Sequence, residues 1–557
     1  MGSSDPAAAA AERTGAWVRL ANHPELILAV LAVFWGIALN RGFLDFAAQA
    51  SGLDGWALFR FVGGLGVSVV ALHWLILLAV MYRWTWRVLL AVLLSAAASS
   101  AWFIDQYGIH IDPAMIRNVL RTDPAEAREL LSFGLLFQIV FYAGVPAFLF
   151  WRIPRAQRSI LHAVLTRVGF IGIGLLLLLA ALLTIMQPLS SFMRNHREAR
   201  YLINPASAVW SLVAALRGDV AQAVTVIRPI GLDASLGPRA VERKRPLRIV
   251  LVVGETVRGA NWGLNGYARD TTPELRAREV INFSRVSSCG TNTEVSLPCM
   301  FAPVGRRQYD ELTIRTSESL LHVLNRAGYS VLWRDNQSGC KGVCRDLPYE
   351  QVTDRGEGGR CQAGRCPDEM LFEGLESILD SSSPNGLLVL HMLGNHGPSY
   401  GRRYPSDRAV FVPDCRSDEL SKCTQQSIVN AYDNAILHTD RLLAGLIDQM
   451  RARSDREDAV VIYLSDHGES LGERGLFLHG VPWAIAPVEQ TWVPWVFWFS
   501  SGAAERIGVD LTCLAERARQ PAQHDHLFHT LLSIADVRTA LYDPEWDLIA
   551  ACRTMTR

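Results

Sequence analysis

Long stretches without a fixed charge in the first 200 residues constrain the fold of this chain most. Four of them lack Asp, Glu, Lys and Arg and are 17 to 26 residues long: 61–82, 88–104, 130–151 and 168–193. A helix needs about 20 apolar residues to cross a bilayer. A shorter apolar segment, 26–39, reaches that length only with its flanks, 24–44. We therefore expect a domain of five transmembrane helices over residues 24–193.

Basic residues around these spans predict their orientation. Arg13 and Arg19 precede the first span, and the second and fourth turns carry further arginines, namely Arg83, Arg87, Arg152, Arg155 and Arg158. The loop between spans three and four instead has mixed charge. Basic loops stay on the cytoplasmic side. We expect residues 1–23 to be cytoplasmic and, after an odd number of spans, everything beyond Arg194 to be outside.

The cysteines independently support an exported second half. All ten lie between Cys289 and Cys552. An even number of cysteines in an exported domain indicates disulfides, although the sequence does not fix their connectivity. The economical pairing joins neighbours: Cys289 with Cys299, Cys340 with Cys344, Cys361 with Cys366, Cys415 with Cys423, and Cys513 with Cys552. A zinc knuckle at 361–366 is less favoured, because no second cysteine pair matches its spacing.

The pattern changes after a connecting region, 194–245. This region contains an amphipathic helix at 205–216 that could lie on a bilayer or pack on the globule. From residue 246 to 557, short apolar runs alternate with helix-length segments; the runs are 247–253, 329–333, 387–392, 459–464 and 493–499. Such alternation predicts an α/β domain with a largely parallel sheet sandwiched by helices. The zero net charge argues against nucleic acid as a partner.

Two of the predicted strands end on groups that bind metals. Asp466 and His467 follow the run 459–464, and Glu255 follows the run 247–253. Ligand sites of open α/β sheets lie beyond the carboxyl ends of such strands. A mixed oxygen and nitrogen set suits zinc better than calcium or magnesium. Helix capping by the two acids is the alternative, and the presence of both strand ends favours the metal site.

A loop bounded by Cys289 and Cys299 offers a nucleophile. It contains the hydroxyls of Thr291, Thr293 and Ser296. A divalent cation bound to such a hydroxyl favours the reactive alkoxide. Position alone does not choose among the three hydroxyls.

Five motifs in this order resemble the phosphoethanolamine transferases that modify lipid A, the family that includes the mobile colistin-resistance enzymes within the alkaline phosphatase/sulfatase-like superfamily. They are Gly254-Glu255-Thr256-Val257-Arg258, the loop 289–299, Gly394-Asn395-His396-Gly397-Pro398, Ser465-Asp466-His467-Gly468-Glu469-Ser470 and Leu478-His479-Gly480. The resemblance covers nearly the whole chain, because the five spans and the mixed-charge loop also fit.

The resemblance implies an activity and a set of site residues. Thr293 would be the nucleophile, coordinated to one zinc ion with Glu255, Asp466 and His467. It would accept phosphoethanolamine from phosphatidylethanolamine as phospho-threonine and pass it to lipid A, and so confer polymyxin resistance. His396 and His479 would bind a second zinc, the phosphoryl group or the acceptor. Substrate would also contact Ser338, Lys341, Asn118, Thr122 and Glu126. The protein would be a monomer in the bacterial inner membrane with a periplasmic catalytic domain.

Several residues have a second interpretation. Asn118, Thr122 and Glu126 are spaced by four, so on a helix they would share one face. From the spacing alone a solvated face is favoured over a substrate-binding one. His391 lies inside an apolar run and is expected to be a hydrogen-bonded core residue. A histidine cluster near the C-terminus has no acid at a strand end and is interpreted as structural: His524, His526 and His529. Asn292 and Glu294 flank Thr293 where we expect small residues in relatives, and we expect Glu294 to point away from the incoming phosphate.

Four other functions remain as alternatives. A hydrolase of the phosphatase or sulfatase type would use the same sheet, although the sulfatase pattern of Cys, Pro and Arg is absent at Cys289 and Cys299. A transferase to core sugars or a glycerol-phosphate polymerase would keep the membrane architecture. A membrane sensor of lipid headgroups would need no nucleophile.

Overall fold

The computed structural model describes residues 24–81, 86–122, 124–152, 159–224, 226–352, 360–361, 366–381 and 385–554. The chain forms two compact units. The first comprises Met1–Ile116 and Leu131–Ala214, and the second comprises Arg117–Leu130 and Ala215–Arg557. The expected cytoplasmic segment 1–23 lies outside the described residues, as do three of the orienting arginines, Arg83, Arg155 and Arg158.

Apolar helices make up the first unit. Among the described residues, four segments are long and apolar enough to cross a membrane: α4 (Gly55–Val80), α5 (Trp86–Tyr107), the run Phe133–Trp151, and α10 (Ile160–Asn195). The third of these consists of α8 (Phe133–Ile139), the π-helical η1 (Val140–Gly144) and α9 (Val145–Trp151). On α10, leucines 175, 176 and 179 are each more than half exposed. Exposed apolar surface of this extent is typical of a membrane contact. Four of the five predicted spans are thus confirmed as helices.

The first predicted span is bent. It consists of α2 (Pro24–Ala38) and α3 (Arg41–Ala50), which meet at 49°. Asn40 lies at the bend, where its amide nitrogen donates to the carbonyls of Trp35 at 2.6 Å and Asn204 at 2.8 Å. The Asn204 backbone N–H donates back to the Asn40 side-chain oxygen at 2.8 Å. A side chain that satisfies backbone groups at this point stabilises the break, which no apolar pattern predicts.

An eight-stranded sheet organises the second unit. Its strand order is β11-β3-β10-β7-β2-β6-β4-β5. The strands are β2 (Leu247–Gly254), β3 (Ile281–Ser287), β4 (Ser330–Asp335), β5 (Tyr349–Gln351), β6 (Asn385–His391), β7 (Asp458–Ser465), β10 (Trp492–Phe499) and β11 (Ala522–Gln523). From β7 to β5 all neighbours are parallel, whereas β10 runs antiparallel to β7 and β3. All five apolar runs are confirmed as strands, and β3, β5 and β11 were not predicted.

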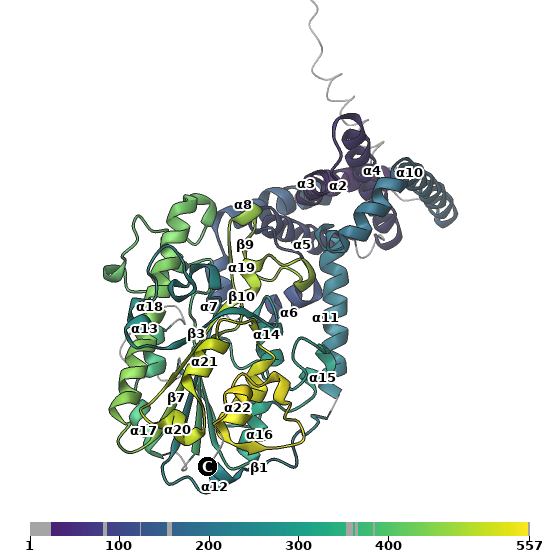
Figure 1. Ribbon diagram of the computed structural model, residues 1–557. Helices are drawn as coiled ribbons and strands as arrows, with labels where there is room; N and C mark the ends of the chain where they lie inside the picture. The colour runs from purple at the N-terminus through teal and green to yellow at the C-terminus, as the bar shows by residue number, and fades with distance from the viewer. Residues whose placement is uncertain are drawn as a thin grey trace, which may run out of the picture. The chain divides into compact units, whose positions relative to one another are not determined.

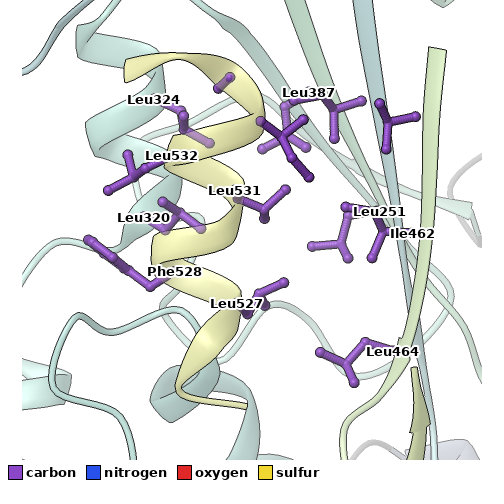
Figure 2. Close-up of a cluster of buried hydrophobic side chains, with 14 of the residues drawn as sticks. Leu251, Leu320, Leu324, Leu387, Ile462, Leu464, Leu527, Phe528, Leu531 and Leu532 are labelled. Atoms are coloured by element: carbon purple, nitrogen blue, oxygen red, sulfur yellow. The ribbon is translucent and has the colours of Figure 1, made fainter. Parts of the chain in front are cut away.

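Helices cover both faces of this sheet (Figure 1). On one side lie α16 (Leu320–Arg326) and α22 (His526–Ala535), and on the other lies the long α18 (Gln425–Ala452). Figure 2 shows Leu527 and Leu531 of α22 directed toward side chains of the three central strands, namely Leu251, Leu387, Ile462 and Leu464. Leu320 and Leu324 of α16 lie on the opposite side of α22, beside Phe528 and Leu532. Every residue of β2, β6 and β7 is buried. Burial on both faces explains why these strands are continuous apolar runs and not alternating ones.

The remaining sequence predictions for this half are tested by smaller elements. All five cysteine pairs form the expected disulfides. The helix predicted at 205–216 is α11 (Ala206–Val224), which is longer than expected. Val209 and Trp210 on its apolar face are exposed by 45% and 65% of their surface.

Candidate active site

The predicted ligands meet at the carboxyl ends of two adjacent strands. Gly254 at the end of β2 pairs in register with Ser465 at the end of β7, so Glu255 leaves the sheet next to Asp466 and His467. The His467 Nε2 atom lies 3.4 Å from Glu255 Oε1 and 3.4 Å from Asp466 Oδ2. All three side chains are fully buried. In the described part of the chain, these three form the one group of acids, histidines and cysteines compact enough to hold a metal ion.

A glycine allows the neighbouring strand end to approach Glu255 closely. Gly394 follows β6 with a φ of +53°, and a Cβ atom there would lie 2.7 Å from the Glu255 carbonyl oxygen. Both the left-handed backbone and the short approach exclude a side chain. The Asn395 N–H donates to that same carbonyl at 3.0 Å. The motif after β6 therefore fixes the backbone of a ligand residue.

Thr293 is the hydroxyl that faces this triad. It is the first residue of α14 (Thr293–Met300), whose N-cap Asn292 accepts from the Val295 N–H at 3.0 Å. The Thr293 Oγ1 atom lies 3.1 Å from both carboxylate oxygens of Glu255 and 3.3 Å from His467 Nε2. Thr291 instead donates to the Val481 carbonyl at 2.7 Å, and Ser296 donates to the Asp466 carbonyl. The structure thus selects Thr293 among the three hydroxyls of the loop, which the sequence positions alone did not do.

Buried charges dominate the electrostatics of the triad. Burial favours the neutral form of Glu255, but the hydrogen bond and the charge of His467 outweigh it and hold the pKa of Glu255 well below its usual range. Burial and the Glu255 charge raise the pKa of Asp466. Burial opposes a charge on His467, yet Asp466 and Glu255 outweigh it and raise the pKa of His467 to about 9. Two carboxylates so close together favour a bound cation.

The hydrogen bonds around the triad leave Asp466 Oδ2 and His467 Nε2 available to coordinate a metal. Asp466 Oδ1 accepts from the N–H groups of Thr256 and His467, while Asp466 Oδ2 is buried without a hydrogen-bond partner among the described residues. His467 Nδ1 is bonded to the Gly468 carbonyl at 2.9 Å. A histidine whose Nδ1–H is held by a carbonyl presents Nε2 as a ligand. The donor set of two carboxylates, one imidazole and one hydroxyl suits zinc.

Two further histidines lie beside the triad. The ring centroid of His479 is 4.5 Å from that of His467 and 5.5 Å from that of His396. His479 follows a short hairpin of β8 (Ser470–Leu471) and β9 (Phe477–Leu478), in which Ser470 pairs with Leu478. This pairing brings Glu469, just before the hairpin, next to His479 just after it.

Glu469 is a further candidate site residue that the sequence reasoning missed. It is fully buried, and its Oε2 atom lies 2.9 Å from His479 Nδ1. Its Oε1 atom accepts from the Tyr400 hydroxyl at 2.7 Å. A buried carboxylate bonded to a ring nitrogen fixes both the tautomer and the orientation of a histidine. The signal available in the sequence was a second acid three residues after Asp466.

Lys341 and Ser338 form a polar pair near α14. Lys341 Nζ donates to Ser338 Oγ at 2.6 Å and lies 3.9 Å from Glu294 Oε2. Glu294 is fully buried, and its carboxylate contacts Arg121 and Arg315, the latter at 2.9 Å. Glu294 is thus directed to partners other than those of Thr293. Its partners are cations that come from distant parts of the sequence.

The three residues predicted to share one helix face do not lie on one helix. α6 (Pro113–Arg121) ends before Thr122, and α7 (Pro124–Leu130) begins after it. Pro124 has no N–H to continue α6, which explains the break. The Thr122 hydroxyl donates to the Asn118 carbonyl at 2.7 Å. The side chain of Glu126 lies outside the described residues.

The segment 117–130 nevertheless belongs to the second unit. Arg117 pairs with Glu311 at 2.7 Å, Arg121 pairs with Glu294, and Glu129 pairs with Arg403. Each of these ion pairs has at least one well-buried partner. The loop that was predicted to carry substrate-binding residues is thus anchored on the unit that carries Thr293.

The four histidines that the sequence analysis interpreted as structural are His391, His524, His526 and His529, and each is buried. His391 is fully buried, with Nδ1 2.9 Å from Asp335 Oδ2 and Nε2 4.0 Å from Glu255 Oε2. His524 accepts from the Cys289 N–H at 3.1 Å, and its Nε2 lies 3.0 Å from the Ser465 carbonyl. His524 therefore joins the loop 289–299 to β7. His526 and His529 are both buried, and burial lowers the pKa of each to about 4.

Comparison with known proteins agrees with this geometry. Residues 248–537 match the family described as Sulfatase, and residues 69–220 match the family described as Phosphoethanolamine transferase EptA/EptB. Phosphoethanolamine transferase EptA of Escherichia coli (strain K12) is 36% identical over 97% of this chain and 99% of its own length. Phosphatidylethanolamine transferase Mcr-1 of Escherichia coli is 34% identical over 94% and 97%, respectively.

A solved structure extends the likeness to both units. The integral membrane protein lipooligosaccharide phosphoethanolamine transferase A of Neisseria meningitidis superposes with a TM-score of 0.92 at 34% identity, covering 95% of this chain and 99% of that one. The agreement includes the apolar helices and the sulfatase-like sheet. With identities above 30% over nearly the full length of both chains, this chain belongs to the phosphoethanolamine transferase family of the alkaline phosphatase/sulfatase-like superfamily.

Proposed function

We propose that this protein transfers phosphoethanolamine from phosphatidylethanolamine to lipid A, with Thr293 as the nucleophile. The observation that carries this proposal is the position of the Thr293 hydroxyl, 3.1 Å from both oxygens of Glu255 and 3.3 Å from His467 Nε2. A hydroxyl that meets a buried carboxylate and an imidazole at a helix N-terminus is placed to lose its proton and attack phosphorus.

The reaction proceeds by two displacements at the same phosphorus. In the first, the Thr293 oxygen attacks the phosphorus of phosphatidylethanolamine, the bond to the glycerol oxygen breaks, and diacylglycerol leaves with a proton. Phosphoethanolamine then remains on Thr293 as a phosphodiester. In the second, an oxygen of the acceptor phosphate attacks this phosphorus, and the Thr293 oxygen leaves and regains a proton. Both steps conserve charge at phosphorus, so positioning and electrostatics supply most of the catalysis.

A zinc ion held by Glu255, Asp466, His467 and Thr293 would lower the pKa of the hydroxyl and stabilise negative charge that develops on the phosphoryl oxygens. The chain's own residues handle the protons. His479 is bonded to Glu469, and its ring lies close to the rings of His467 and His396. This pair of histidines is positioned to protonate the leaving diacylglycerol oxygen and to accept a proton from the acceptor.

We place the chain in the bacterial inner membrane, with the second unit in the periplasm. Five disulfides in this unit suit an oxidising compartment. The helices of the first unit are apolar enough to span a bilayer, where the donor lipid resides. Adding an ethanolamine group places an ammonium beside the acceptor phosphate. The product would attract cationic polymyxins less strongly, which is the basis for a resistance phenotype.

A purified full-length protein in detergent tests this proposal. With fluorescent phosphatidylethanolamine and lipid A, we expect diacylglycerol and a lipid A product whose mass has increased by one phosphoethanolamine group. Thr293→Ala should abolish both products. Thr291→Ala is the matched control: it removes a neighbouring hydroxyl that donates to the Val481 carbonyl and should retain activity. Soluble phosphoethanolamine without modified lipid A would indicate a hydrolase, and full activity of Thr293→Ala would exclude the nucleophile.

A further inference from the structure

The backbone that carries His396 is held from two sides. Before His396, the N–H groups of Leu393 and Gly394 donate to the buried carboxylate of Asp368 at 2.9 Å and 2.8 Å. After it, the chain returns so that the Arg403 Nε–H donates to the His396 carbonyl at 2.7 Å. Arg403 therefore fixes the residue that bears the imidazole itself.

Arg403 makes a second contact with its two terminal nitrogens. Its Nη1–H donates to Glu129 Oε1 at 3.3 Å, and its Nη2–H donates to Glu129 Oε2. Both side chains are buried. A guanidinium group presents its donors in a rigid fork, so one arginine can bind a carbonyl and a carboxylate at the same time. The three groups His396, Arg403 and Glu129 thus form one connected chain of hydrogen bonds.

Glu129 belongs to a segment that enters the second unit from the helical half of the sequence. It lies on α7, within the segment 117–130. Its two preceding neighbours on α7 are exposed, whereas Glu129 is buried. The same segment contains Asn118 and Thr122, which the family resemblance associates with substrate. The contact with Arg403 therefore joins this segment to a histidine of the candidate active site.

We propose that Arg403 is a positioning residue that makes the position of His396 depend on the docking of the segment 117–130. The guanidinium that holds the His396 carbonyl is itself held by Glu129. If the segment moved away, Arg403 would lose its buried counter-ion, and a buried charge without a partner is strongly disfavoured. The inference rests on the proposed function, because His396 is one of the two histidines assigned there to proton transfer.

The imidazole would follow any shift of its own backbone. The His396 Nδ1 atom is bonded to the Gly397 carbonyl at 2.8 Å, so the ring is fixed relative to the main chain beside it. The ring centroid lies 5.5 Å from that of His479. A group that transfers a proton must lie within hydrogen-bond reach of the reacting oxygen, and a small misplacement slows the reaction strongly. Loss of the Arg403 contact should thus lower kcat more than it changes donor binding.

Arg403→Lys tests the contact with His396. Lysine keeps the positive charge beside Glu129, but its single nitrogen cannot occupy the places of all three guanidinium nitrogens. In steady-state transfer by the full-length protein, kcat should fall about tenfold while the KM for phosphatidylethanolamine stays within about twofold. Unchanged kcat would overturn the proposal.

A buried arginine at the other end of the sheet provides the matched control. Arg248 lies near the start of β2, whereas Glu255 follows the end of that strand, and its Nε–H donates to the buried Glu457 at 3.2 Å. Arg248→Lys makes the same chemical change in a similar environment. It should leave both kcat and KM within about twofold of wild type, because it contacts no residue of the candidate site.

A variant without the imidazole separates positioning from a general loss of structure. His396→Ala should slow transfer by about a hundredfold or more, and long incubation with the fluorescent donor measures the residual rate. In this background Arg403→Lys should slow transfer by less than about twofold, because no ring remains to be misplaced. A tenfold slowing in both backgrounds would show that Arg403 acts on the whole unit, and it would overturn the proposal.

Glu129→Gln tests the link to the segment 117–130. The amide keeps one acceptor oxygen for Arg403 but removes the charge, so kcat should fall about threefold. Combined with Arg403→Lys, it should add less than about a further 1.5-fold, since both substitutions act through the same contact. If the two effects multiplied fully, the segment and His396 would be independent, and the proposed coupling would be wrong.

Hydrogen exchange follows the loop without any turnover. Mass spectrometry of peptides that cover residues 393–400 in the full-length protein should show exchange about tenfold faster in Arg403→Lys and faster in Glu129→Gln, but unchanged in Arg248→Lys. If the wild-type protein modified no lipid, the proposed function would fail, and this measurement would still decide whether Glu129 and Arg403 hold the loop. Unchanged exchange in both variants would refute the inference by itself.

Discussion

The bond between Glu469 and His479 gives the sharpest test of how the site is organised. Glu469 is fully buried and accepts from two groups, His479 at 2.9 Å and the Tyr400 hydroxyl at 2.7 Å. In Glu469→Gln the side chain keeps its size, but the amide has one acceptor oxygen where the carboxylate has two. The glutamine NH2 group would therefore face either His479 or Tyr400, and there it can donate a hydrogen bond but cannot accept one. The substitution also removes the negative charge.

The magnitude follows from these contacts. A hydrogen bond to a charged group contributes about 1.5–3 kcal/mol, and a neutral one about 0.5–1.5 kcal/mol. Losing the charge should thus cost roughly 1–2 kcal/mol of transition-state stabilisation, because His479 loses its fixed orientation. At about 1.4 kcal/mol per factor of ten, kcat should fall about five- to thirtyfold. The KM for the donor lipid should be unchanged, since Glu469 is buried behind the histidine.

Steady-state transfer with fluorescent phosphatidylethanolamine measures this effect. Tyr400→Phe is the matched variant, because it removes one hydrogen bond to Glu469 and leaves the bond to His479. It should have the smaller effect, and the double variant should be less than additive because both act through one carboxylate. Wild-type kcat in Glu469→Gln would refute the reasoning. So would a loss of activity explained entirely by a smaller folded fraction in circular dichroism.

The remaining predictions concern the metal and its backbone. A Cβ atom at Gly468 would lie 2.0 Å from the Glu489 carbonyl oxygen, so Gly468→Ala should lower the free energy of unfolding by about 1–3 kcal/mol and impair transfer. Gly445→Ala on α18 is the control, because a Cβ atom there would meet open space, and it should be neutral or stabilising. Denaturant titration measures both free energies of unfolding. Zinc added to chelator-treated protein should raise the thermal unfolding midpoint, and Asp466→Asn should remove most of that rise; an equal rise in both proteins would exclude Asp466 as a ligand. Because the pKa of His467 is raised to about 9, zinc must displace a proton at neutral pH, and its affinity should increase about tenfold per pH unit between about pH 6 and 8 in calorimetry. Affinity independent of pH in this range would contradict the raised pKa of His467.

Local sequence patterns predicted the parts of the fold that depend on continuous burial. The strands β2, β6 and β7 are buried on both faces, so their apolar runs were unmistakable. β3 has a mixed pattern of buried and exposed residues, and β5 and β11 have only three and two residues, so no run marks them. The disulfides were predictable because four of the five close loops of ten residues or fewer.

The candidate site was predictable where it depends on strand ends. Glu255, Asp466 and His467 follow central strands directly, so the parallel sheet alone brings them together. Thr293 required the family resemblance, because its selection over Thr291 depends on how the first turn of α14 is oriented. The partners of Glu294 and Glu469 depend on segments that are distant in sequence or on a hairpin with two residues per strand, and neither carries a periodic signal.

The division of the chain into units bears on how the enzyme can be dissected. Residues 117–130 are covalently inside the helical half but belong to the second unit, so the polypeptide passes between the units three times. A fragment that begins at residue 215 would retain the sheet and the triad but would lack Arg121 and Glu129. Glu294 would then lose one of its cations, and Arg403 its buried carboxylate. Such a fragment would lack the two ion pairs that hold residues 117–130 on the second unit, so measurements made on it would describe an incomplete second unit.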